Sequence, residues 1–171
     1  MTRYGTVVIG VLMFAFASWA QSPPQHQHTI AAPNLIDGAA HPELIPDSVA
    51  YRLYLVAVST GQNPTEAEQT RQRAHVTRTG LGDTDQQLLI SILSDFRAKY
   101  DALVNEYNDS AKAAAARDET TDVHTLLKKL DGLVQSTRDA ISVRLSSRGA
   151  AKLHAFVLSE KKNMQSTEGA E

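Results

Sequence analysis

Histidines are the first residues in this sequence whose type and spacing could do chemistry. His26 and His28 lie two positions apart, and His41 follows in the same proline-rich part of the chain. Neutral imidazoles bind zinc, copper and nickel, but a metal site holds three or four ligands in fixed positions. No carboxylate lies near the pair until Asp37, so we expect weak metal binding here and no built metal site. The other histidines are His75, His124 and His154, and each is isolated on a separate predicted helix. We expect each of them at a solvated helix face or at a helix boundary.

Acidic residues cluster at one predicted loop, where Asp118, Glu119 and Asp122 lie close in sequence. Such a group could bind a hard cation, but it lacks the spacing of an EF-hand calcium loop, and we interpret it as a solvated turn. The chain has no G-x-S-x-G, P-loop or H-E-x-x-H pattern, and no cysteine that could act as a nucleophile or thiolate ligand. The sequence therefore predicts a protein that is not an enzyme and needs no cofactor.

Helix electrostatics explain the other acidic residues that stand out. Asp83 and Asp85 begin a predicted helix, where negative charge interacts favourably with the helix macrodipole, and Asp83 is also a candidate N-cap. Asp95 precedes Lys99 by four residues, the favourable order for an ion pair along a helix. We expect these residues to stabilise helices rather than to form a site.

Four tyrosines could line a groove: Tyr51, Tyr54, Tyr100 and Tyr107. Each follows the helical spacing of its apolar neighbours, and such periodicity is primarily a packing signal. A tyrosine at a core boundary buries its ring and keeps its hydroxyl at the wet rim. We expect that arrangement for all four.

The start of the chain has the pattern of a secretory signal. Arg3 precedes a nearly unbroken apolar run over residues 7–17, and Ser18 and Ala20 are the small residues of a cleavage site before Gln21. An uncleaved anchor is the weaker alternative, because a spanning helix needs about 20 apolar residues. Residues 1–20 are thus predicted to be a signal peptide. The mature chain is predicted to be exported, periplasmic or secreted, without a transmembrane segment.

The net charge of the mature chain indicates which classes of partner it can bind. Without Arg3, 16 of the 17 Lys and Arg residues remain against 19 Asp and Glu residues, a net charge of about −3. A general nucleic-acid binder normally has a basic excess or stripe, so we expect no nucleic-acid partner. The sequence leaves the oligomeric state open.

Proline divides the mature chain into segments. Residues 21–46 hold five of the six prolines, and each proline removes a backbone donor and disfavours helix before it. This segment is predicted to be an extended leader that becomes ordered near Leu35 or Leu44. Residues 47–164 are predicted to form a helical domain, and residues 165–171 a polar, disordered tail.

The helical domain begins with a run, residues 47–59, that is apolar on almost every side. Asp47 and Ser48 are good N-cap residues, and a helix that is apolar all round is buried. A strand is the alternative, since the run is rich in strand formers, but its length and the lack of a partner strand favour helix. Leu53 and Val56 are expected in the core.

A polar surface helix is predicted over residues 65–79. Thr65 and Glu68 form a capping box at its start. Gly61 is a natural end for the preceding helix, and Gly80 for this one.

Two long helices follow, with apolar residues alternately three and four positions apart, as in a bundle or coiled coil. The third, residues 83–117, and the fourth are joined by a short loop, which predicts an antiparallel αα-hairpin. Alanines near the loop leave little side chain to bury, so we expect a thin, mobile tip. The apolar stripes comprise Leu89, Ile92, Phe96, Tyr100, Leu103, Tyr107 and Ala111, then Val123, Leu127, Leu130, Val134, Thr137 and Ile141.

A fifth helix is predicted after Leu145, capped by Ser146 or Ser147, with Leu153, Phe156 and Val157 as its apolar face. The predicted fold class is therefore all-α: a helical bundle of about five helices, built around a long antiparallel αα-hairpin.

Two stretches, "IDGAAHPELIPDSVAYRLYLVAVS" and "LSSRGAAKLHAFVLSEKKNM", resemble a group of small exported all-helical bacterial proteins without a characterised activity. More distantly, the chain looks like the periplasmic helical proteins with LTxxQ repeats, which include stress-induced chaperones. "LSSRG" has Gly149 where that motif has glutamine, and "LGDTDQ" at 81–86 replaces threonine by glycine and displaces the glutamine.

The leading functional hypothesis is an exported, non-enzymatic helical protein that binds other polypeptides or an envelope component. This hypothesis includes a role as a chaperone-like or stress factor. This hypothesis rests on the long hairpin, the lack of catalytic patterns and the distant resemblance to the LTxxQ proteins. The alternative is a metal-binding or metal-sensing envelope protein that uses the histidines of the leader.

Overall fold

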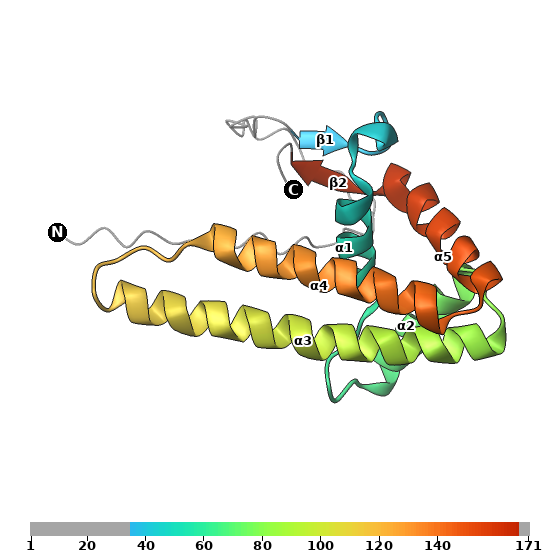
Figure 1. The fold of residues 1–171 in the computed structure, drawn as a ribbon, viewed down its shortest axis with the longest axis horizontal. Coiled ribbons are helices and arrows are strands. Elements are labelled where there is room, and N and C mark those ends of the chain that lie inside the picture. The colour runs from blue at the N-terminus through green and yellow to red at the C-terminus, as the bar shows by residue number, and fades with distance from the viewer. Residues whose placement is uncertain (1–34, 168–171) are drawn as a thin grey trace, which may run out of the picture. The chain divides into compact units, whose positions relative to one another are not determined.

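The structure is a computed structural model, which describes residues 35–167. These residues form five α-helices: α1 (Asp47–Val58), α2 (Glu66–Arg78), α3 (Asp83–Ala115), α4 (Val123–Arg144) and α5 (Ser147–Glu160). Two 3-10 turns, η1 (Pro42–Leu44) and η2 (Lys161–Asn163), and two strands, β1 (Leu35–Asp37) and β2 (Gln165–Thr167), complete the described part (Figure 1). The fold is an all-α helical bundle, as predicted. The predicted signal peptide and residues 21–34 of the leader lie outside the described residues.

The hairpin of α3 and α4 is the longest feature of the fold (Figure 1). Its two apolar stripes face each other, and Leu89, Phe96 and Ile141 are almost fully buried. In the connecting loop Asp118 has a φ of 58°, in the left-handed region that aspartate tolerates better than most residues. α3 ends at Ala115, two residues before its predicted end. None of the helices among residues 35–167 has the length and apolar composition needed to cross a membrane.

α1 crosses the hairpin and contacts α3, α4 and α5 (Figure 1). It is the buried helix that was predicted, and the strand alternative is wrong. The prediction for its core residues is only partly right. Leu53 and Val56 are half-buried at the edge of the core. Leu55 is fully buried, because it shares one helix face with Tyr51 and Val58, and that face meets the hairpin.

The start of α1 differs from the prediction. Pro46 is the N-cap and no side chain caps the helix. Asp47 is already helical, and its carboxylate accepts a hydrogen bond from Lys161 Nζ at 2.6 Å. Gly61 is not the cap at the other end, since α1 ends at Val58. Asp83 is likewise the first residue of α3 rather than its N-cap.

α2 is the predicted polar surface helix, and its capping box is confirmed. Thr65 Oγ1 accepts a hydrogen bond from Glu68 N at 3.3 Å, and the Glu68 carboxylate accepts one from Thr65 N at 2.7 Å. Gly80 follows the helix with a φ of 68°, which glycine adopts without strain. Gln72 and Val76 are the buried residues of α2.

The first turns of α3 and α5 are joined by Asp85. Ser146 caps α5, as predicted, by accepting a hydrogen bond from Gly149 N at 3.0 Å. Asp85 in turn accepts hydrogen bonds from Ser146 N at 2.9 Å and Ser146 Oγ at 2.6 Å. Gly149 is buried, and a Cβ there would collide with the Asp85 carboxylate. Close packing at the helix junction therefore explains the glycine in "LSSRG".

The two-stranded sheet was not predicted from the sequence. β1 and β2 are antiparallel, with Leu35 opposite Thr167 and Asp37 opposite Gln165. The predicted disordered tail is wrong for residues 165–167, and residues 168–171 lie outside the described part. Three-residue strands carry little local signal, and these two pair only because the helices between them bring both ends together.

Candidate functional site

The outer arm of the hairpin, residues 104–130, is one candidate binding surface. Figure 1 shows that it extends beyond α1, α2 and α5, with no other described element beside it. Its apolar side chains are shared between only two helices. Leu126 and Leu127 are half-buried and Val123 is 43% exposed, although Leu130 at the base of the arm is buried. Leu89 and Leu93 of the inner part are fully buried.

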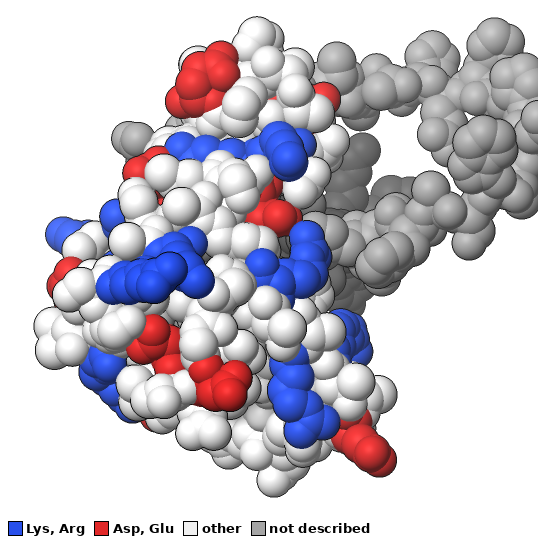
Figure 2. Space-filling model, turned by 90° about the vertical axis from the view of Figure 1, so that its right-hand side faces the viewer, with Lys and Arg blue, Asp and Glu red and all other residues white. Residues whose placement is uncertain are grey.

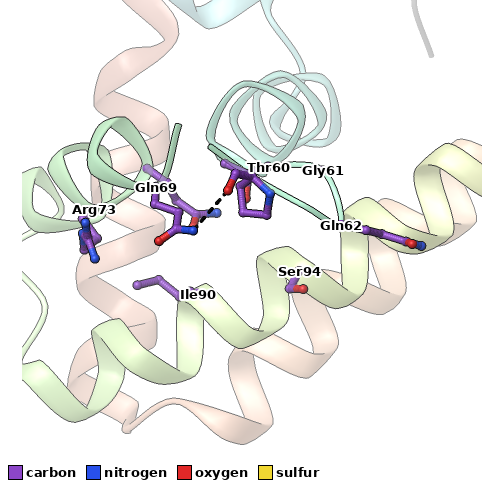
Figure 3. Close-up of a pocket in the computed structure, with 9 residues that line it drawn as sticks. Thr60, Gly61, Gln62, Gln69, Arg73, Ile90 and Ser94 are labelled. Carbon is purple, nitrogen blue, oxygen red and sulfur yellow. Dashed lines mark hydrogen bonds between the residues drawn. The ribbon is translucent and has the colours of Figure 1, made fainter. Parts of the chain in front are cut away.

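A small cleft lies where the loop after α1 meets α2 and α3 (Figure 3). Its volume is about 260 Å³, which is below the range of about 300–1,000 Å³ for small-molecule pockets. Gln69 Nε2 donates to the backbone carbonyl of Pro64 at 3.2 Å. Gln69, Arg73, Ile90 and Ser94 line the cleft without a pair of groups suited to acid–base chemistry.

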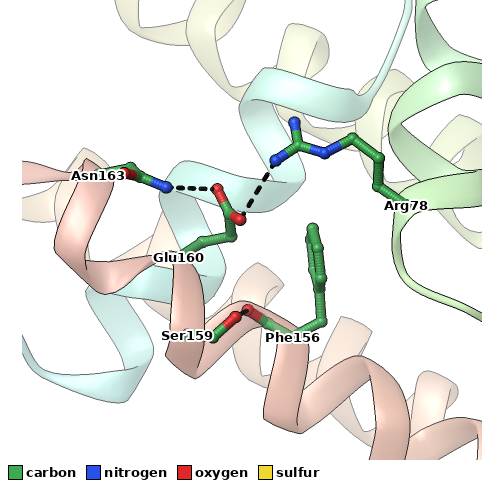
Figure 4. A network of polar contacts seen from close by, with 5 residues as sticks. All are labelled: Arg78, Phe156, Ser159, Glu160 and Asn163. Atoms are coloured by element: carbon green, nitrogen blue, oxygen red, sulfur yellow. Dashed lines mark hydrogen bonds and ion pairs between the residues drawn. The ribbon is translucent and has the colours of Figure 1, made fainter.

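A polar network joins the end of α2 to the end of α5 (Figure 4). The Arg78 guanidinium lies 5.9 Å from the centre of the Phe156 ring and 3.4 Å from Glu160 Oε1. Asn163 Nδ2 donates to the other Glu160 oxygen at 3.0 Å. Every charge in this network has a partner, so we interpret the network as a structural contact that holds α2 and α5 together.

Tyr51 of α1 is the centre of a second polar cluster. Its hydroxyl lies 3.2 Å from His154 Nδ1, and the two rings stack at 6.0 Å. The Arg138 guanidinium lies 4.7 Å from the centre of the Tyr51 ring. One turn earlier on α1, the hydrogen bond from Lys161 lowers the pKa of Asp47. Burial raises the pKa of Tyr51, so its hydroxyl stays neutral near pH 7.

Charged side chains of both signs are scattered over the face of the molecule drawn in Figure 2. Lysines and arginines form separate groups with acidic residues among them. This face has no continuous basic stripe of the kind that tracks a nucleic-acid backbone.

No family model, curated protein sequence or solved structure matches this chain.

The predicted metal residues are not assembled in the described part of the chain. His26 and His28 lie outside it. His41 Nδ1 is 3.2 Å from Glu43 Oε1, and both side chains are exposed. Among residues 35–167, no three His, Cys, Asp or Glu side chains are grouped so that they could hold a metal ion. Metal binding by the leader therefore stays a prediction.

The other predicted histidines and acidic residues have separate local roles. His75 is half-buried, and this burial lowers its pKa. Glu119 pairs with Arg117 at 2.9 Å. Asp122 caps α4 by accepting a hydrogen bond from His124 N at 2.9 Å. These contacts agree with a solvated turn.

The predicted ion pair of Asp95 with Lys99 is wrong, because Asp95 reaches across the hairpin. Its carboxylate lies 3.4 Å from Arg144 Nη1 of α4. Arg144 also donates to Ser91 Oγ at 3.2 Å. A partner on the neighbouring helix thus replaces the one expected along α3.

The prediction of a rim hydroxyl is wrong for Tyr54 of α1, whereas the Tyr51 hydroxyl lies against the exposed His154. Tyr51 and Tyr54 are 4% and 5% exposed. The Tyr54 hydroxyl is buried and hydrogen-bonds no residue of the described part, and this burial raises its pKa. Tyr100 and Tyr107 are half-buried, as expected for a core boundary.

Sequence reasoning missed Arg138, which proves to be the cation of the Tyr51 cluster. It lies 87 residues from Tyr51 in the chain, and nothing in its local sequence separates it from the other arginines. Only the crossing of α1 over α4 brings the two together.

Proposed function

We propose that the protein is an exported, non-catalytic helical protein that binds an amphipathic helical segment of another polypeptide through the outer arm, in the manner of a chaperone or stress factor. The observation that supports this function is the incomplete burial of Val123, Leu126 and Leu127 in the outer arm. These three residues lie within the first two turns of α4, and contiguous apolar surface is typical of binding sites.

α1 supports the choice of a helix as the partner. Over the inner part of the hairpin it places apolar side chains on α3 and α4, and Arg52 Nη1 donates to Asp131 Oδ1 of α4 at 3.2 Å. Asp131 follows the outer arm directly. A partner helix with apolar residues at i, i+3, i+4 and i+7 would continue the layer that α1 begins.

Val123 and Val143 provide a matched test. Both belong to α4, and they are 43% and 83% exposed, but only Val123 lies in the outer arm. Val123→Asp is expected to raise the Kd for a synthetic amphipathic helical peptide about tenfold, or ~1.4 kcal/mol. Val143→Asp should leave it unchanged. Fluorescence anisotropy with the mature chain measures both values.

Equal Kd values for the two variants, or no peptide binding by the unaltered chain, would contradict this function. Binding to phosphatidylglycerol vesicles that Val123→Asp abolishes, without peptide binding, would identify an envelope lipid as the partner instead.

Export has a separate test. Mass spectrometry of the protein recovered from outside the cytoplasm should find Gln21 as the first residue. Recovery of a chain that retains Arg3 would refute the signal peptide.

A further inference from the structure

Three arginines of the described part lie over aromatic rings: Arg78 over Phe156 at 5.9 Å, Arg97 over Tyr100 at 5.8 Å and Arg138 over Tyr51 at 4.7 Å. Two of these guanidinium groups also have a carboxylate. Glu160 lies 3.4 Å from Arg78 (Figure 4), and Asp101 lies 2.8 Å from Arg97. The third, Arg138, forms no hydrogen bond or ion pair with any residue from 35 to 167 through its guanidinium.

Arg138 differs from an ordinary solvated arginine. It is half-buried, and its guanidinium makes the closest ring contact of the three. A guanidinium carries five N–H donors in a planar fork. Packing on the ring fixes the plane of that fork, so less conformational entropy is lost when it binds an acceptor.

No side chain of the described part near Arg138 supplies it with a carboxylate. His154 contacts the same tyrosine ring, and Lys161 lies close to Asp47, one turn before Tyr51. The Asp47 carboxylate is occupied by Lys161 Nζ at 2.6 Å. Lys161, His154 and Arg138 all lower the pKa of Asp47, with Lys161 the largest contribution. The positive charge of Arg138 is thus left without a carboxylate of its own.

We propose that Arg138 and His154 form a binding site for an external oxyanion, a carboxylate or a phosphate group. The planar fork of arginine matches either group with two parallel hydrogen bonds. When His154 Nδ1 accepts from the Tyr51 hydroxyl, the ring hydrogen is on Nε2, which makes this exposed imidazole a second donor. The ligand would complete at Arg138 the arrangement that Glu160 and Asp101 complete at the other two arginines.

The helices hold this site in place. Tyr51 belongs to α1, Arg138 to α4 and His154 to α5, and these three helices contact one another in the core (Figure 1). Side chains on packed helices are positioned more accurately than side chains on loops. The site is therefore formed before the ligand arrives.

The test is a titration of the mature chain with inorganic phosphate, and separately with acetate, at constant ionic strength. Saturable shifts of the His154 ring signals in NMR spectra are expected with at least one of them. Arg138→Gln should raise the Kd about tenfold or more, ~1.4 kcal/mol. Arg138→Lys keeps the positive charge but loses the planar fork, so its Kd should lie between those of the unaltered chain and Arg138→Gln. Arg97→Gln is the matched control, because Arg97 also lies over a tyrosine but is paired with Asp101.

The titrations distinguish the possible ligands. A response to phosphate alone assigns the site to phosphate, and a response to acetate alone assigns it to carboxylates. No saturable shift with either, or equal Kd values for Arg138→Gln and Arg97→Gln in chains with unchanged circular dichroism, would overturn the proposal. Peptide binding at the outer arm would be unaffected by that result.

Discussion

The Tyr54 hydroxyl is buried without a hydrogen-bond partner in the described part of the chain. A buried polar group in this state lowers stability. Tyr54→Phe is therefore expected to leave the free energy of unfolding unchanged or to raise it by up to about 1–3 kcal/mol, as measured by urea melts. A clear loss of stability would mean that the hydroxyl has a partner.

Leu55 and Leu53 test which face of α1 meets the hairpin. Leu55 is fully buried, so Leu55→Ala should lower the free energy of unfolding by about 2–5 kcal/mol. Leu53 is half-buried, so Leu53→Ala should cost less, because part of that side chain already contacts water. Urea melts of the two variants give the comparison, and a larger loss for Leu53→Ala would contradict the packing of α1.

At the scale of elements, Asp85 joins α3 to α5 in a pH-dependent way. The hydrogen bonds from Ser146 Oγ and Ser146 N lower the pKa of Asp85 below its ordinary value of 3.8. Because the pKa of Asp85 is lower in the folded state, the ionised carboxylate stabilises the fold at any pH above the ordinary pKa of aspartate. That stabilisation is lost as the pH falls through the folded-state pKa.

Asp85→Asn should therefore lower stability at neutral pH and converge with the unaltered chain in strong acid, where both side chains are neutral. Urea melts from about pH 7 to pH 2 would follow this difference across the range in which aspartate titrates. Asp83→Asn is the control, because Asp83 is on the same turn and its side chain forms no hydrogen bond or ion pair with the described residues. An unchanging gap between Asp85→Asn and the unaltered chain would refute the charged junction.

The outer arm should be the least stable part of the hairpin. Its apolar side chains are shared by two helices only, and local opening is easiest where few apolar contacts are buried. Amide hydrogen exchange should be faster over residues 104–130 than over residues 89–96, which belong to the inner part of α3. Equal protection along α3 would show that the arm is supported by something other than the described elements.

At the scale of the whole molecule, one apolar core joins all five helices. A core of this kind, formed without cysteine, should unfold in one cooperative transition that does not require a metal. Circular dichroism of the mature chain in urea, with and without a chelator, is expected to give the same midpoint. A lower midpoint in chelator would favour the metal-binding alternative.

The sequence by itself determined the features that depend on residues within a few positions of each other. The capping box of Thr65 and Glu68 and the Ser146 cap close hydrogen bonds over three residues. The stripes of α3 and α4 repeat every three or four residues, so the hairpin and the all-α fold could be predicted from periodicity alone.

Tertiary structure decided the contacts between residues far apart in the chain. Asp85 meets Ser146 across 61 positions, and β1 meets β2 across the entire helical domain. Arg138 reaches Tyr51 only where α1 crosses α4. Local sequence carries no signal for such pairs, because their free energy is gained only after the helices have packed. Tertiary structure also decided which face of α1 is buried. Both Leu53 and Leu55 are apolar enough for a core, but only Leu55 lies on the face that contacts the hairpin and is fully buried.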